Sequence, residues 1–321
     1  MPGVDGGGEA TSDFGARLLR GDPTSPEEWQ HQLRAFHAQL PGATSAAFAR
    51  RTTREGRSSY QFLVDSAVAA ARASARPVDI LDLACGDGYL MQECLRQLGV
   101  RVSTVTGVDM SEAELSAAHA RLNDPRVLLR SGLAQSLPLA DASIDVALCH
   151  AAFMLMLPVE PVVAELARVL RPGGMFSAVV GSTSASPLSL DSPELATQRA
   201  LWTETGAALR AFWQTEYPRL KTDGRVGDAR AMSADGWREL FRPELGYAGA
   251  VELQEFDILV KEDSPEGIWH FFEKTYLVSL LDAEAKESLR RRLIDVIAEH
   301  ERTHRTLEMA FPLRLLTVYT S

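Results

Sequence analysis

Between residues 77 and 181 the sequence alternates short apolar runs with amphipathic segments, and this rhythm constrains the fold more than any other feature. The apolar runs predict strands at 78–84, 102–108, 127–130, 144–149 and 175–180. The segments between them predict helices that begin after Gly88, at 111–122 and at 159–170. Strands that alternate with helices favour a parallel sheet covered on both faces. We therefore predict a doubly wound α/β fold.

The segments on either side of this core are predicted to be additions to it. The expected divisions are a flexible leader at 1–25, a helical lid at 26–76, the α/β core at 77–181, a helical cap insert at 182–250, and late strands and helices at 251–321 that complete sheet and cap. The leader and a loop at 182–190 are inferred from their Gly, Ser and Pro content. Further helices are expected at 194–220, 233–241, 265–281 and 283–305, and further strands at 251–260 and 313–319.

Composition narrows the class of partner and compartment. The chain has 43 acidic and 33 basic residues, and a net charge of −10 argues against binding to nucleic acid or an anionic membrane. The longest apolar stretch, 147–157, is shorter than the ~20 residues that a membrane-spanning helix needs. The three cysteines are too scattered for a disulfide framework or a CxxC metal site. We expect a cytoplasmic protein with no metal, as a monomer or homodimer.

A glycine-containing turn follows the first predicted strand, in the sequence Asp82-Leu-Ala-Cys-Gly-Asp-Gly88. Gly86 and Gly88 allow backbone geometries, and a close approach of a ligand, that a Cβ atom would hinder. The helix that begins behind them offers free N–H groups. Dinucleotide enzymes and plain tight turns use the same Gly-x-Gly spacing, so the turn alone leaves the ligand open.

Asp109 at the end of the second strand makes the turn more informative. An acidic residue at this position can accept hydrogen bonds from both hydroxyls of a ribose. Alternatively, Asp109 caps the helix at 111–122, but Ser111 already stands in the capping position. A dinucleotide-binding dehydrogenase is the alternative fold, and it requires a third glycine where this chain has Met91.

Four motifs occur in a fixed order: ILDLACGDG at 80–88, GVDMS at 107–111, SGLAQSLPLADASIDVALCHAAFML at 131–155 and RVLRPGGMF at 168–176. In these motifs the chain resembles the class I S-adenosylmethionine-dependent methyltransferases. The resemblance is to the small-molecule branch, which includes ubiquinone/menaquinone-type and natural-product enzymes. It covers about 100 residues and implies a Rossmann-like core. It also implies S-adenosylmethionine as cofactor and S-adenosylhomocysteine as product.

The resemblance also implies roles for individual residues. Asp82, with the backbone of Ala84 and Gly86, is expected to hold the methionine end of the cofactor, and Asp109 its ribose. The other cofactor-binding residues that it implies are Gly88, Met110, Leu133, Ala134, His150 and, from the lid, Tyr60. Relatives often have an Asp where this chain has Leu133, so adenine recognition is expected to use backbone groups or Gln135.

His150 is the candidate catalytic residue, because it ends the fourth strand and such ends face the ligand crevice. It is either a general base or a residue that packs against the cofactor without proton transfer. The sulfonium is already an activated methyl donor, so alignment of the acceptor is the main requirement. Tyr60 is expected either to close over the cofactor or to belong to the core. His31 and His37 are expected on the surface of the lid.

Aromatic residues concentrate in the predicted cap and late helices: Trp202, Phe212, Trp213, Tyr217, Trp237, Trp269, Phe271, Phe272 and Tyr276. They form either the core of the cap or the lining of a pocket for an apolar acceptor. We therefore predict methyl transfer to a small, largely apolar natural-product-type metabolite, with oxygen favoured as the accepting atom. The alternatives are C-methylation of an alkene, enol or terpenoid-type acceptor, and cofactor binding without transfer.

Overall fold

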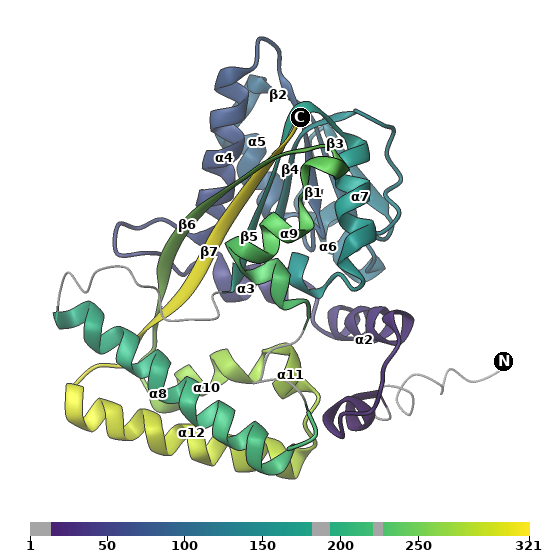
Figure 1. Cartoon of the computed structure of the whole chain (residues 1–321). Helices are drawn as coiled ribbons and strands as arrows, with labels where there is room; N and C mark the ends of the chain where they lie inside the picture. Colours follow the sequence, from purple (N-terminus) through teal and green to yellow (C-terminus); the bar gives the residue numbers. More distant parts are fainter. Residues whose placement is uncertain (1–13, 182–192, 221–226) are drawn as a thin grey trace. The chain divides into compact units, whose positions relative to one another are not determined.

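The computed structural model describes residues 14–181, 193–220 and 227–321, and these form a seven-stranded mixed sheet flanked by helices (Figure 1). The strand order is β3-β2-β1-β4-β5-β7-β6. The strands are β1 (Val78–Leu83), β2 (Val102–Asp109), β3 (Val127–Ser131), β4 (Ile144–His150), β5 (Leu170–Gly181), β6 (Tyr247–Lys261) and β7 (Glu308–Thr320). The first five strands pair in parallel and β7 is antiparallel to β5. The doubly wound α/β prediction is confirmed.

From residue 26 onward the described residues contain eleven α-helices, and all but the one at 43–48, which was not predicted, lie close to a predicted helix. They are α2 (Pro26–Gln39), α3 (Ala43–Phe48), α4 (Ser59–Ala73), α5 (Tyr89–Leu98), α6 (Glu112–Arg121), α7 (Val159–Val169), α8 (Pro193–Glu216), α9 (Ala234–Leu240), α10 (Pro265–Glu273), α11 (Tyr276–Ser279) and α12 (Ala283–His304). One predicted helix, at 265–281, is divided into α10 and α11. The division falls at Thr275, whose backbone is extended (φ −74°, ψ 148°) and which is the N-cap of α11.

The strand order places a topological switch point between β1 and β4. The chain passes from β1 outward to β2 and β3, and then returns to form β4 on the other side of β1. Asp82 of β1 is in register with Gly107 of β2 and with Leu148 of β4. The crossovers after β1 and β4 therefore depart in opposite directions. Open α/β sheets bind ligands at such a switch point, in a crevice outside the carboxyl ends of the strands.

The two faces of the sheet are covered by different helices. Ala147 and Cys149 of β4 belong to a buried apolar cluster that includes residues of α7 and α9. The neighbouring residue on the strand, His150, contacts Ser59 at the start of α4 instead. Because successive side chains of a strand point to opposite faces, α4 lies on the face opposite α7 (Figure 1).

The described residues divide into two compact units. We call them the sheet unit (37–181, 227–258 and 312–321) and the helical unit (14–36, 193–220 and 259–311). This division differs from the single cap insert expected at 182–250, because α9 belongs to the sheet unit. Trp237 of α9 stacks on Phe176 of β5, with ring centroids 5.3 Å apart. Such a contact between residues far apart in sequence leaves no local pattern.

The helical unit has its own apolar core. It takes in most of the aromatic residues expected in the cap and is made of α8, α10, α11 and α12 side chains, including Phe212, Trp213, Trp269, Phe271 and Phe272, with Trp202 and Tyr217 packed against it. Leu19 joins this core and residues 14–19 are helical, which differs from the flexible leader expected over 1–25. The loop expected at 182–190 lies outside the described residues.

The described residues contain neither a reactive cysteine nor a helix that could cross a membrane. Cys85, Cys94 and Cys149 are all free and buried. Burial raises the pKa of each thiol, so none of them is a reactive thiolate at neutral pH. No helix among the described residues combines the length and the apolar character needed to cross a bilayer.

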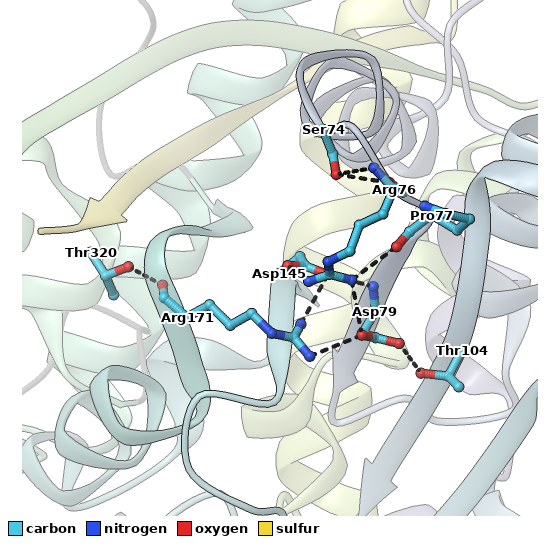
Figure 2. A network of polar contacts seen from close by, with 8 residues as sticks. All are labelled: Ser74, Arg76, Pro77, Asp79, Thr104, Asp145, Arg171 and Thr320. Carbon is cyan, nitrogen blue, oxygen red and sulfur yellow. Dashed lines mark hydrogen bonds and ion pairs between the residues drawn. The ribbon is translucent and has the colours of Figure 1, made fainter.

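A network of charged side chains ties together the amino-terminal ends of the central strands (Figure 2). Arg171 at the start of β5 places its two terminal nitrogens 3.0 Å from Asp79 of β1 and 3.0 Å from Asp145 of β4. Arg76 contacts the same two carboxylates, and Thr104 of β2 donates to Asp79. These residues lie at the end of the sheet opposite the crevice, so we assign the network to stability.

We expect Arg171→Ala to lower the free energy of unfolding by about 1–3 kcal/mol, because two largely buried carboxylates lose their shared partner. Urea denaturation checks this. Arg76→Ala is the matched control: its side chain is 48% exposed against 30% for Arg171, so we expect a smaller loss. An equal or larger loss in the Arg76 variant would contradict this assignment.

Candidate functional site

The turn after β1 adopts the strained geometry that its sequence suggests. Gly88 is the N-cap of α5 with φ +76°, and a Cβ atom there would lie 2.7 Å from Leu122. Ala84 also has a positive φ, of 56°, which is costly for a residue with a side chain. Strain of this kind concentrates at binding and catalytic sites, where the surrounding structure compensates for it. The expected role of Ala84 and Gly86, which is to hold the methionine end of the cofactor with backbone groups, depends on this backbone conformation.

Gly107 of β2 allows the turn to pack closely on the second strand. A Cβ atom at this position would lie 2.6 Å from the sulfur of Met91 and 2.8 Å from that of Cys85. Any larger residue would push these buried side chains apart, so glycine favours the close packing. The close approach brings the turn to within hydrogen-bonding distance of the end of β2.

Asp109 at the end of β2 links the two glycine-containing segments. Its carboxylate oxygens accept hydrogen bonds from the backbone N–H groups of Gly86, at 2.9 Å, and Ser111, at 2.8 Å. Burial raises the pKa of Asp109, although both hydrogen bonds act against this. Each carboxylate oxygen keeps a second lone pair, so the group can still accept from two hydroxyls. Ser111 caps α6 as expected, its hydroxyl accepting from the N–H of Glu114.

Asp82 is the most perturbed carboxyl group of the site. It is 3% exposed, and its Oδ2 has no hydrogen-bond partner among the described residues. Burial, together with the nearby charges of Asp109 and Asp87, raises its pKa to about 8. A buried carboxylate without a partner is unstable, so this position favours a ligand that brings a positive charge and hydrogen-bond donors.

Two further acidic residues surround the turn, and our sequence reasoning gave neither of them a binding role. Asp87 accepts a hydrogen bond of 2.6 Å from the hydroxyl of Ser45 and pairs with Arg121. Glu114 is buried, and it accepts from the N–H of Gly42 at 2.9 Å and contacts His37 at 2.8 Å. These contacts fasten α3 and the end of α2 over the turn.

The sequence signal for Glu114 was present but ambiguous. Ser111 and Glu114 have the spacing of a capping box, in which the glutamate bonds back to the residue that caps the helix. The N–H of Ser111 instead donates to Asp109, and Glu114 binds Gly42, which is 72 positions earlier in the chain. His37, expected on the surface, is half-buried by this contact, whereas His31 is exposed.

His150 lies at the end of β4 inside a cluster of aromatic rings. Its imidazole stacks on Tyr60 of α4, with ring centroids 3.8 Å apart and an interplanar angle of 11°. Nε2 lies 2.8 Å from the hydroxyl of Ser59, and Nδ1 has no partner among the described residues. Phe48 contacts the ring edge-on. Burial lowers the pKa of His150 to about 3, so the imidazole is neutral and a weak base at physiological pH.

The expected adenine-binding residues lie after β2 and β3. Met110 is half-buried directly after Asp109, and Leu133 and Ala134 are half-buried in a turn closed by a bridge from Leu133 to Ser136. The side-chain nitrogen of Gln135 donates to the carbonyls of Leu157, at 3.1 Å, and Pro158, at 3.4 Å. Both of its N–H donors are engaged, so any contact of Gln135 with adenine would use its oxygen.

The residues at the carboxyl ends of β1 and β2 fit S-adenosylmethionine. The unpartnered oxygen of Asp82 suits the ammonium of its methionine end, and the free lone pairs of Asp109 suit two ribose hydroxyls. The assignment of individual contacts to these residues remains a prediction.

The chain is similar in sequence to known methyltransferases over this region. Residues 81–178 match the family model of the methyltransferase domain. A probable S-adenosylmethionine-dependent methyltransferase of Mycolicibacterium smegmatis is 39% identical over 101 residues, which cover 30% of this chain and 36% of the relative. The ubiquinone biosynthesis O-methyltransferase of Rhizobium leguminosarum is 34% identical, covering 34% and 44%. The ubiquinone/menaquinone biosynthesis C-methyltransferase of Methylobacterium nodulans is 35% identical, covering 32% and 41%.

The likeness in three dimensions extends further along the chain. A putative methyltransferase from an antibiotic biosynthesis pathway of Anabaena variabilis superposes with a TM-score of 0.53 at 15% identity, covering 81% of this chain and 96% of that one. Residues 81–178 are therefore similar to a methyltransferase domain, and the solved structure shows that the fold around them is shared. The chain spans less than half the length of these three sequence relatives, so the likeness in sequence is that of the domain.

Proposed function

We propose that this chain transfers a methyl group from S-adenosylmethionine to an oxygen atom of a small, largely apolar metabolite. The observation that carries the proposal is the pair of buried carboxylates, Asp82 and Asp109, at the ends of adjacent strands of a methyltransferase domain. One has an oxygen without a partner and the other has lone pairs to spare, as a ligand with an ammonium and a ribose requires.

The residues of the chain divide the work of holding the cofactor. Asp82 would hold the ammonium, Asp109 the ribose hydroxyls, and Leu133 and Ala134 would flank the adenine. When bound, S-adenosylmethionine supplies an activated methyl group whose loss leaves the neutral thioether S-adenosylhomocysteine. Alignment of the acceptor and exclusion of water then account for most of what the protein must add.

The weak basicity of His150 limits which acceptors the site can methylate. A neutral imidazole with a pKa of about 3 takes up a proton poorly, so an acceptor with an unreactive alcohol would find no base here. We propose an acceptor that ionises by itself near neutral pH, such as an acidic phenol or an enol. The anion concentrates its charge on oxygen and attacks the methyl carbon with that atom. The carbon–sulfur bond then breaks, and its electron pair stays on sulfur.

His150 then serves to position its neighbours. We expect His150→Gln, which can keep a contact with Ser59, to retain turnover within about tenfold of the wild type, whereas loss of a general base costs ~10²–10⁴-fold. His150→Ala should lose more, because Tyr60 loses its stacking partner. The measurement is kcat against pH from 5.5 to 8.5. If kcat falls by ~10²-fold or more in the Gln variant, and the kcat profile loses a pH-dependent limb that the wild type shows, His150 acts as a general base.

The acceptor class is supported by charge and by the relatives. The net charge of −10 disfavours nucleic acid, and the two named quinone-pathway relatives act in ubiquinone or menaquinone biosynthesis. We propose a natural-product-type acceptor that is small and largely apolar. We also propose that the reaction is cytoplasmic, in line with three free cysteines. The C-methyltransferase among the relatives favours transfer to carbon as the second candidate.

The proposal is tested by incubating the full chain with methyl-deuterated S-adenosylmethionine and a panel of phenols, enols and hydroxyquinones, followed by mass spectrometry and NMR. We expect a product that carries a trideuteromethyl group bonded to oxygen. A label on carbon would establish the second candidate. Tight cofactor binding with no labelled product from the panel or from a bacterial metabolite extract would contradict the proposal and favour a protein that binds the cofactor without transfer.

A further inference from the structure

The helical unit brings together three metal-ligating side chains that methyl transfer does not use. The last turns of α12 read His300-Glu-Arg-Thr-His304, so two histidines stand four residues apart on one face of the helix. Glu204 of α8 lies against them, with its Oε2 2.8 Å from Nδ1 of His300. The imidazole rings of the two histidines are 4.4 Å apart. One ligand atom from each residue lies within 4.8 Å of the other two.

The burial of His300 distinguishes this cluster from a surface ion pair. Its side chain is fully buried, whereas the Glu204 side chain is 41% exposed and His304 is exposed. Nε2 of His300 has no hydrogen-bond partner among the described residues. The fully buried imidazole of His300 therefore meets the Glu204 carboxylate through Nδ1 and lies beside a second imidazole, that of His304.

We propose that Glu204, His300 and His304 bind a divalent transition-metal ion of the zinc class. Two imidazole nitrogens and one carboxylate oxygen form a ligand set that zinc accepts, and paired histidines at this helical spacing are a known way to present it. Zinc–ligand bonds of ~2.0–2.1 Å place tetrahedral ligands ~3.4 Å apart. Small rotations of the two exposed side chains, Glu204 and His304, would bring the present set to that spacing.

The site is open on one side and closed on the other. With three protein ligands the ion keeps a fourth position, and the exposure of Glu204 and His304 gives that position access to solvent. The bound ion would fasten the end of α12 to α8, both of which lie in the helical unit. The expectation that the chain binds no metal rested on its scattered cysteines, and this site uses none of them.

Binding is tested on the full chain after treatment with a chelator, by calorimetry with Zn²⁺ and by the visible absorption of the Co²⁺ form. We expect one ion per chain, a tetrahedral Co²⁺ spectrum and a rise in the melting temperature on addition of Zn²⁺. His304→Ala and Glu204→Gln should each weaken Zn²⁺ binding by at least about 100-fold and remove that rise, because each deletes one of three protein ligands.

Two matched controls separate the site from adventitious binding. Glu301→Gln changes one of the three residues between the histidines, which is not in the ligand set, and His31→Ala removes an exposed histidine of the same unit. Both should bind Zn²⁺ as the wild type does. The proposal is overturned if the wild type binds no ion, or if the Glu204 and His304 variants bind it as tightly as the controls do. Since the side chain of Glu204 is 41% exposed and His304 is exposed, their replacement is compatible with folding.

Discussion

Replacing Asp109 by alanine is expected to weaken the binding of S-adenosylmethionine by about 10³-fold, because hydrogen bonds to a charged group contribute ~1.5–3 kcal/mol each and two ribose hydroxyls lose their acceptor. The same change removes the two backbone hydrogen bonds that fix Gly86 and Ser111. Calorimetric titration of the cofactor measures the effect.

Two further variants make this result interpretable. Glu112→Ala removes an exposed carboxylate three residues away and should leave the affinity unchanged. Asp109→Asn keeps one acceptor oxygen and should give an intermediate affinity. It is the variant to measure if the alanine variant folds poorly. Near-normal affinity in a folded Asp109→Ala variant would mean that the ribose lies elsewhere.

Asp82→Asn is expected to produce two effects of opposite sign. Cofactor binding should weaken by about 10- to 100-fold, because the ammonium loses a charged partner. In the wild type the carboxyl must ionise to form that pair, so at pH 6.5 binding should release about one proton per cofactor. Calorimetry in two buffers of different ionisation enthalpy measures the proton. The asparagine variant should release none.

The second effect is on the stability of the unliganded protein. The pKa of Asp82 is 3.8 in the reference state and about 8 in the fold, so between these values the folded chain holds a proton that the unfolded chain has lost. Stability therefore falls as the pH rises from about 4 to 8. Asparagine cannot ionise, so we expect the variant to be about 1–3 kcal/mol more stable than the wild type at pH 8.5 and nearly equal to it near pH 4.

Urea denaturation at the two pH values checks this difference. If the asparagine variant is less stable than the wild type at pH 8.5, the carboxylate has a partner in the fold and is not waiting for a ligand. The loss of affinity and the gain of stability would together show that the site retains an unfavourable group because the cofactor needs it.

The central sheet could be predicted from the sequence because its information is local. Each of β1 to β5 is a short apolar run bounded by helix signals, and the structure moves their limits by only a few residues. The largest shift is in β5, which begins at Leu170 and not at Met175, because Leu170 pairs with Ile144 across the sheet. That pairing depends on a register that no single segment encodes.

The surroundings of the site could not be predicted, because their contacts join distant segments. Glu114 meets Gly42 and Asp87 meets Ser45 only after α3 folds over the turn. The weak basicity of His150 likewise depends on burial by Tyr60 and Phe48, whereas the sequence shows only that it ends a strand. Residue types at strand ends were enough to propose a site there, whereas the protonation states of those residues required the structure.

The central claim is that the carboxyl ends of β1 and β2 hold S-adenosylmethionine, and hydrogen–deuterium exchange with and without S-adenosylhomocysteine tests it most directly. We predict that saturating ligand slows exchange in peptides covering 84–90, 109–113 and 131–137, and leaves α8 and α12 unchanged. Slowed exchange confined to other segments, or none at saturation, would contradict the account.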